Sequence, residues 1–236
     1  MQAWVKKEPS LFHLRVVELI WRLEGMTEKE KMMAGLLYDA VGDEETNRER
    51  MYYYDLCHEF NHCRPSDHEK QDELLKKILG KYGKDPIAFG PIEIDLGYNV
   101  EVGDNFFMNH GTVILATNKV KFGDHVMIAP NCTFSCAGHP FDTERRNAGM
   151  EYAFPITVGD NVWIGMGCRV CPGVTIGSNT IIAAGSVVCH DIPDGVIAAG
   201  NPCKVVRELA QEDFDRYSGE ESEYDFAARH MKKEMK

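Results

Sequence analysis

His139 carries the side chain best suited to chemistry in this sequence of 236 residues. It stands between Gly138 and Pro140 in a segment, residues 137–157, that collects Pro, Arg, Asp and Asn. Imidazole has a pKa of about 6.5, so at neutral pH it can remove the proton from an attacking hydroxyl. From the residues alone, His139 is either such a general base or a surface histidine beside a turn.

Other histidines and the cysteines form no metal or disulfide pattern. His110, His125 and His190 are scattered along the chain. Cys168 and Cys171 make a lone C-x-x-C pair, and a zinc site would need further ligands. Most of the eight cysteines lie in repeats where a small apolar side chain fits. We therefore expect structural, reduced cysteines and no bound metal.

A six-residue repeat must position His139. Between residues 158 and 193 each hexad opens with an aliphatic side chain, in turn Val158, Ile164, Val170, Ile176, Ile182 and Val188. A fixed short period is typical of a solenoid, in which each repeat stacks on its neighbours. Six is neither the helical period nor a strand alternation. The pattern predicts short straight segments joined by sharp corners, each pointing one aliphatic side chain into a common interior.

The same register continues upstream of His139. One set of hexads opens at Phe122, Ile128 and Phe134, and another, displaced by two residues near 119–121, opens at Val102, Met108 and Ile114. The repeats therefore run from about residue 92 to about residue 198, and residues 137–157 interrupt them once. Because the repeat resumes in register, we predict that this segment is a loop extruded from the solenoid, where function is often located.

The chain ends differ from the repeats. Residues 1–25 contain an amphipathic pattern that predicts a helical extension. Thr27 and Glu30 form a capping-box pattern before a predicted helix over 31–38, and two more helices are predicted over 44–63 and 67–79. We divide the chain into that extension, a helical cap and linker (26–90), a β-solenoid (91–207) and a charged tail (208–236).

Composition limits the classes of function. A formal net charge of −11 argues against a general nucleic-acid binder, which usually presents a basic face. The sequence shows no apolar run of about 20 residues and no export signal, so we expect a cytoplasmic protein that does not span a membrane.

Several segments resemble the maltose and galactoside O-acetyltransferases, a branch of the hexapeptide-repeat acyltransferases. The resemblance spans roughly residues 26–208 and includes GYNVEVGDNFFMN (97–109), GHPFDTERRN (138–147) and AAGNPCKVVRE (198–208). Its most specific parts are the GHP loop together with NFFMN (105–109) and FNHCRPS (60–66). It implies a mainly β protein, a left-handed parallel β-helix with an N-terminal helical cap, assembled as a homotrimer. It also implies acetyl-CoA as donor and a sugar or glycoside hydroxyl as acceptor.

The resemblance assigns roles on the acceptor side. His139 falls on the family's general base, and Asn109 on an asparagine that positions the acceptor hydroxyl and the developing charge. Asp39 and Phe107 are further candidates for acceptor binding. Thr117 stands where sugar-acetylating members often carry an acidic residue, and this departure leaves the identity of the acceptor open.

On the donor side, the resemblance places an oxyanion-binding backbone N–H at Met166. Ala184 and Gly185 belong to the corner along which pantetheine would lie. Near the nucleotide end of CoA, the pair Cys189 and His190 replaces the Thr-Lys that relatives often carry. We therefore expect Lys204 and Arg207 to be the more important partners for the CoA phosphates.

Three alternatives stay open at this point. The acceptor could be an antibiotic or serine, since acetyltransferases for both share the prism. A zinc carbonic anhydrase-like protein uses the same β-helix but needs three converging histidines. An inactive binding scaffold is the third, and the intact pair of His139 and Asn109 argues against it.

Overall fold

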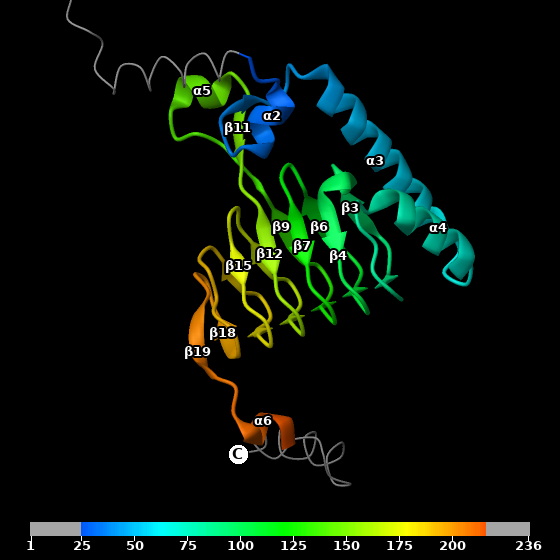
Figure 1. Ribbon diagram of the computed structural model, residues 1–236, viewed down its shortest axis with the longest axis vertical. Helices are drawn as coiled ribbons and strands as arrows, with labels where there is room; N and C mark the ends of the chain where they lie inside the picture. The colour runs from blue at the N-terminus through cyan, green and yellow to red at the C-terminus, as the bar shows by residue number, and fades with distance from the viewer. Residues whose placement is uncertain (1–24, 216–236) are drawn as a thin grey trace, which may run out of the picture.

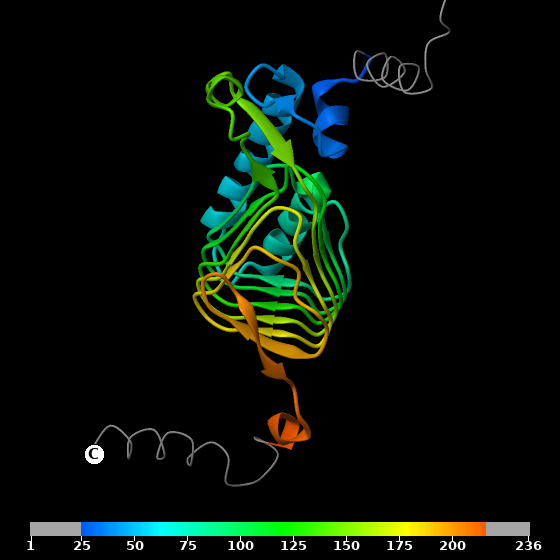
Figure 2. The same cartoon turned by 90° about the vertical axis from the view of Figure 1, so that its left-hand side faces the viewer.

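The computed structural model describes residues 25–215, and its main body is a left-handed parallel β-helix (Figure 1). Viewed along the solenoid, the coils stack as a triangular prism (Figure 2). The fold expected from the hexads and the resemblance is confirmed. The helix predicted within residues 1–25, and residues 216–236 of the predicted tail, lie outside the described residues.

Three sheets form the sides of the prism, and successive strands visit them in turn. Sheet I contains β3 (Ile92–Ile94), β6 (Thr112–Leu115), β9 (Thr133–Ser135), β14 (Arg169–Val170) and β17 (Val187–Val188). Sheet II contains β4 (Val100–Val102), β7 (Val120–Phe122), β12 (Ile156–Val158) and β15 (Thr175–Ile176). Sheet III contains β2 (Ile87–Ala88), β5 (Phe107–Met108), β8 (Met127–Ile128), β13 (Trp163–Ile164), β16 (Ile181–Ile182), β18 (Val196–Ala199) and β19 (Lys204–Glu208).

The coils differ in length at one corner of the prism. Trp163 pairs with Ile181 in the late coils, whereas Phe107 pairs with Met127, so the early coil is two residues longer. The additional residues lie at the corner between sheets I and II (the I–II corner), where one coil contains the 3-10 turn η1 (Gly97–Asn99) and the next contains residues 116–119. The register slip predicted near 119–121 is therefore confirmed, immediately before β7.

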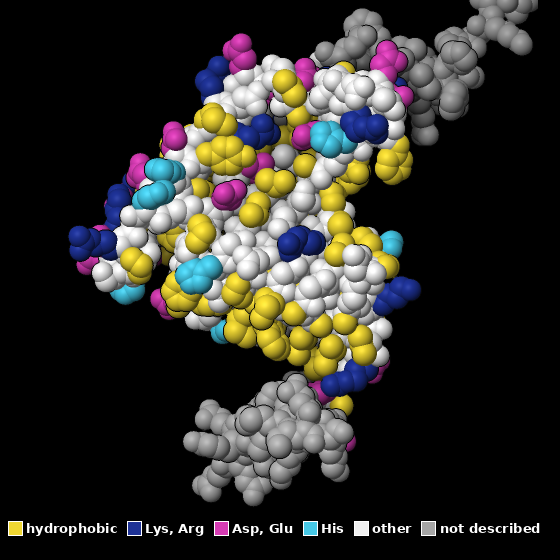
Figure 3. Space-filling view, turned by 180° about the vertical axis from the view of Figure 1, so that it is seen from behind, with side chains coloured by type: hydrophobic (Ala, Val, Ile, Leu, Met, Phe, Trp, Pro, Cys, Tyr) yellow, Lys and Arg dark blue, Asp and Glu magenta, His cyan; other side chains and the backbone are white. Residues whose placement is uncertain are grey.

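A hairpin is extruded from this I–II corner in the following coil. It consists of β10 (Ala137–Gly138), the short helix α5 (Thr143–Asn147) and β11 (Met150–Ala153). β11 pairs antiparallel with β10 on one side and with β1 (Tyr38–Asp39) of the cap on the other. The predicted loop is thus a folded unit, fastened to the cap. Seen from behind, the surface is hollowed between the cap and the hairpin (Figure 3).

The cap consists of α2 (Glu28–Met33), α3 (Glu44–His62) and α4 (His68–Ile78). The Thr27–Glu30 capping box is present, but the helix predicted over 31–38 begins earlier and ends at Met33. Gly35 adopts a φ of +71°, which ends the helix, and the chain then enters β1. The other two helices agree with the prediction within about a residue at each end.

Asn61 fastens α3 to the first coil. Its amide donates to the carbonyl of Ile92 at 2.9 Å and accepts from the N–H of Ile92 at 2.8 Å. Phe60 of the same helix and Leu74 of α4 are buried against the solenoid. The cap therefore closes the open end of the β-helix and covers its otherwise exposed core.

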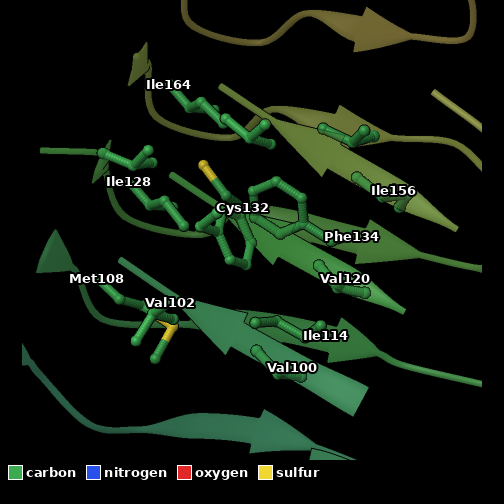
Figure 4. Packing of buried hydrophobic residues seen from close by; sticks show 14 of the residues in the cluster. Val100, Val102, Met108, Ile114, Val120, Ile128, Cys132, Phe134, Ile156 and Ile164 are labelled. Atoms are coloured by element: carbon green, nitrogen blue, oxygen red, sulfur yellow. The ribbon is translucent and has the colours of Figure 1, made fainter. Parts of the chain in front are cut away.

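The interior confirms the hexad prediction (Figure 4). The side chains that open the hexads are at most 4% exposed, from Val102 and Met108 through Phe122, Ile128 and Phe134 to Val188. Phe122 packs between Phe106 and Phe134, tilted against the first ring and edge-to-face with the second, with ring centroids 5.1 Å apart on both sides. Burial of each such side chain contributes about 1.5–3 kcal/mol, so stacking supplies a rigid frame for the corners. After β19 the described chain ends in α6 (Gln211–Asp215).

Candidate active site

The three-stranded sheet β1–β11–β10 brings His139 to two residues of other strands. Tyr38 pairs with Glu151, and Gly138 pairs with Tyr152. Because β10 and β11 are antiparallel, the residue after Gly138, His139, lies opposite Glu151. Residues opposite each other on neighbouring strands point to the same face of a sheet. Tyr38, Glu151 and His139 therefore form one row across the hairpin and the cap.

The imidazole of His139 is held through Nδ1. This atom lies 3.1 Å from the carbonyl oxygen of Met150, which can only accept, so Nδ1 carries the proton in the neutral ring. Nε2 is then the atom with the free lone pair. It lies 3.9 Å from Oε1 of Glu151, and the His139 side chain is 52% exposed. This arrangement suits a general base that meets its substrate from solvent.

Glu151 is held in turn by Tyr38. The Tyr38 hydroxyl donates to Oε2 of Glu151 at 2.6 Å, and Tyr38 is 1% exposed. Burial, then the hydrogen bond to Glu151, raise the pKa of Tyr38 well above its usual value, so the phenol stays a neutral donor. Sequence reasoning missed both residues, because only the β1–β11 pairing joins positions 113 residues apart.

Glycine is required before His139. A Cβ at Gly138 would lie 2.4 Å from the ring atoms of Tyr152, whose side chain covers this position. The Gly138-His139 pair therefore fits the hairpin because a bare backbone lets the Tyr152 ring approach. The sequence places Gly138 directly before His139 but does not identify the ring that needs the space.

Two predicted acceptor residues lie close to this row. Asp39 follows Tyr38, and its Oδ1 accepts the N–H groups of Val41 and Gly42 at 3.1 and 2.8 Å. Thr117 is 2% exposed beneath the cap, beside Tyr38, and its hydroxyl has no hydrogen-bond partner of good geometry among residues 25–215. Arg50, which the sequence did not single out, acts electrostatically on Tyr38 from α3.

Asn109 lies at a different corner of the prism. It follows β5 at the corner between sheets III and I (the III–I corner), and its Oδ1 accepts the N–H of His110 at 2.8 Å. Met166, Ala184 and Gly185 occupy the same corner in later coils, all exposed. Within one chain, the structure therefore brings Asn109 together with the predicted donor residues and separates it from His139.

The remaining predicted residues occupy three places. Cys189 and His190 lie at the I–II corner, in a later coil than the hairpin, and Phe107 lies partly buried on the outer face of sheet III. Lys204 and Arg207 are exposed on β19. Arg207 forms a bidentate ion pair with Asp213, at 2.5 and 2.6 Å, so binding a phosphate there means exchanging that partner.

The described residues show the state of the thiols and of possible metal ligands. All eight cysteines are free thiols. In residues 25–215 no group of three or more His, Cys, Asp and Glu side chains is arranged to hold a metal ion. No helix in that part of the chain is long and apolar enough to cross a membrane.

Comparisons with known proteins agree with this architecture. Residues 31–83 match the maltose acetyltransferase hexapeptide capping motif, and residues 155–190 match the bacterial transferase hexapeptide, six repeats. A galactoside O-acetyltransferase of Escherichia coli is 42% identical over 192 residues, covering 81% of this chain and 94% of that protein. A putative acetyltransferase of Saccharomyces cerevisiae is 48% identical over 184 residues, covering 78% and 94%.

Solved structures are similar in fold as well as in sequence. A maltose O-acetyltransferase from Clostridium difficile superposes with a TM-score of 0.77 at 45% identity, covering 79% of this chain and 99% of the other. A galactoside acetyltransferase in complex with coenzyme A superposes with a TM-score of 0.79 at 41% identity, covering 83% and 97%. Capping motif, repeats and full-length similarity agree, and the chain belongs to the maltose and galactoside O-acetyltransferase family of hexapeptide-repeat acetyltransferases.

Proposed function

We propose that this protein transfers the acetyl group of acetyl-CoA to a hydroxyl of a sugar or glycoside, with His139 as general base. The observation that carries the proposal is the hydrogen bond from Nδ1 of His139 to the carbonyl of Met150, because it leaves Nε2 of the neutral ring unprotonated on a side chain that is half exposed. The donor and acceptor classes are supported by relatives that are named galactoside and maltose O-acetyltransferases and by a relative in complex with coenzyme A.

The proposed reaction is a direct transfer. Nε2 of His139 takes the proton of the acceptor hydroxyl as the oxygen attacks the thioester carbonyl. The carbonyl oxygen becomes an oxyanion, for which the N–H of Met166 is a candidate donor, since it donates to no backbone carbonyl in the described coils. The C–S bond then breaks, and the imidazolium returns the proton to the leaving sulfur, giving an O-acetyl ester and free CoA.

The separation of His139 from Asn109 supports a site shared between subunits of a homotrimer. Ile87, Met127 and Trp163 are each about half exposed, at 51%, 52% and 49%, and follow one column on the outer face of sheet III. An apolar column of this kind is typical of a contact between subunits. In such an assembly the III–I corner of one subunit, with Asn109, Met166, Ala184 and Gly185, would face the hairpin of its partner.

We place the reaction in the cytoplasm. The eight free thiols, most of them inside the prism, support this location because disulfides are rare in the reducing cytosol.

The test of the proposal is thiol release from acetyl-CoA with a panel of glucosides, galactosides, maltose and chitooligosaccharides, with serine and hydroxyl-bearing antibiotics alongside. We expect turnover with at least one sugar and a loss of about 100- to 10,000-fold in kcat for His139→Ala. His58→Ala, an exposed change on α3, is the matched control and should leave kcat unchanged. An unimpaired His139→Ala enzyme would contradict the mechanism, and turnover with only non-sugar acceptors would contradict the acceptor class.

A further inference from the structure

We propose that Glu151 binds a second hydroxyl of the acceptor, next to the one that reacts, and so makes the enzyme selective for polyhydroxylated acceptors. This inference rests on the proposed role of His139. It concerns a residue outside the set predicted from the sequence, and it assigns the class of acceptor: molecules with two neighbouring hydroxyls.

The carboxylate of Glu151 lies next to the proposed base. Oε1 of Glu151 lies 3.9 Å from Nε2 of His139, the atom that would take the proton of the reacting hydroxyl. A hydrogen bond from a hydroxyl to either atom spans about 2.8 Å. Two hydroxyls on adjacent or next-but-one carbons can therefore donate one to Nε2 and the other to Oε1. A simple alcohol can engage only one of them.

One oxygen of the Glu151 carboxylate is engaged in a hydrogen bond within the protein, and the other is available to a substrate. Oε2 accepts from Tyr38, a buried phenol that donates its proton to no other acceptor among residues 25–215. The only ion-pair contact of Glu151 in that part of the chain is His139. The side chain is still 20% exposed. Tyr38 thus fixes the rotamer of Glu151 and leaves Oε1 directed toward the base and solvent.

Closure of the site by a substrate changes the hydrogen bonding of the Glu151 carboxylate. A fixed, largely buried carboxylate loses a hydrogen bond to water when a substrate closes the site, and only a donor on that substrate replaces it. Sites built to hydrogen-bond a substrate hydroxyl reject analogues without it far more strongly than apolar pockets distinguish a methylene. The Tyr38–Glu151 pair therefore adds discrimination that His139 alone does not provide.

The test compares a glycoside that the wild-type enzyme acetylates with its monodeoxy analogues. For the wild type we expect one analogue, lacking a hydroxyl adjacent or next-but-one to the acetylated position, to lose at least about tenfold in kcat/KM. In Glu151→Gln the kcat/KM of the parent glycoside should fall toward that of the analogue, so that the ratio of the two kcat/KM values approaches one. Tyr38→Phe removes the hydrogen bond that holds the carboxylate. It should partly reduce the same ratio of kcat/KM values, mainly through a higher KM for the parent glycoside.

Glu144→Gln, an exposed change on α5 of the same hairpin, is the matched control and should keep the wild-type ratio. Glu151→Asp guards against misfolding, since it retains the charge and should keep the preference for the same hydroxyl at lower kcat/KM. An unchanged ratio in Glu151→Gln, with activity that still depends on His139, would overturn this inference alone. Absence of turnover with any glycoside, or an active His139→Ala enzyme, would instead overturn the proposed function.

Discussion

Three consecutive residues of β11 determine how His139 is held. The carbonyl of Met150 binds Nδ1, the side chain of Glu151 lies beside Nε2, and the ring of Tyr152 covers Gly138. In an extended strand the side chains of neighbouring residues point to opposite faces, while the carbonyls lie in the plane of the sheet. A single short strand can therefore contact both ring nitrogens and the backbone before the histidine.

Asp95 supports the I–II corner below this hairpin, and it makes stability depend on pH. It is 3% exposed, and its Oδ1 accepts the N–H groups of Leu96 and Ala116 at 2.8 and 2.6 Å. Burial raises the pKa of Asp95 above that of an unfolded chain. The stability linked to its proton is thus fully present below the unfolded pKa, about 3.9, and is lost as the pH rises through the raised value.

Asp95→Asn should therefore raise the melting temperature at pH 7.5, because the amide keeps an oxygen for both N–H groups and carries no charge. The difference from wild type should shrink as the pH approaches 4. Thermal unfolding at both pH values is the measurement. Asp55→Asn, an exposed change on α3, controls for net charge. A difference of the same size at both pH values would contradict the argument from ionisation.

At the scale of elements, Asn118 joins the cap, the hairpin and the solenoid. Its amide nitrogen lies 3.3 Å from the carbonyls of Met32 and Met33 at the end of α2 and 2.9 Å from that of Ala153 in β11. The residue is 4% exposed. It therefore fixes the position of β11, and with it that of Glu151, relative to α2 of the cap.

Asn118→Ala should lower the free energy of unfolding by about 1–3 kcal/mol, since it leaves buried carbonyls without their donor. It should also lower kcat, because the row from Tyr38 to His139 depends on the placement of β11. Urea unfolding and steady-state kinetics check the two effects. Asn147→Ala, an exposed change at the end of α5, should alter neither. A stable variant with wild-type kcat would show that the hairpin holds itself in place.

Periodicity explains which elements were predictable from the sequence. The hexads predicted the interior residues, because one buried side chain per segment is a local pattern. The lengths of α3 and α4 followed from local patterns as well. The hairpin and β1 could not be predicted from local patterns, because their antiparallel pairing joins distant segments. The capping box favoured a longer first helix, which Gly35 ends. The sequence and the resemblance identified His139, whereas Glu151 and Tyr38 became visible only through that pairing.

At the scale of the whole molecule, the apolar column on sheet III predicts how subunits associate. Trp163→Glu places a charge in the column and should convert the proposed trimer into monomers in sedimentation experiments. Activity should fall with the loss of the proposed trimer, because Asn109 and His139 would then not face each other across subunits. Thr157→Glu, on the outer face of sheet II, is the control. A monomeric wild-type enzyme, or an active monomeric variant, would contradict the shared site.

The variable length of the coils at the I–II corner has a consequence for how acceptor preference can diverge. Insertions of two residues, and of a whole hairpin, occur there, and the strands on either side still pair in register. The predicted donor residues at the III–I corner are untouched by these insertions. A single edge of the prism can thus be lengthened, exchanged or remodelled while the scaffold and the edge with the predicted donor residues stay constant. New acceptor ranges can arise by grafting at that one edge, without redesign of the protein.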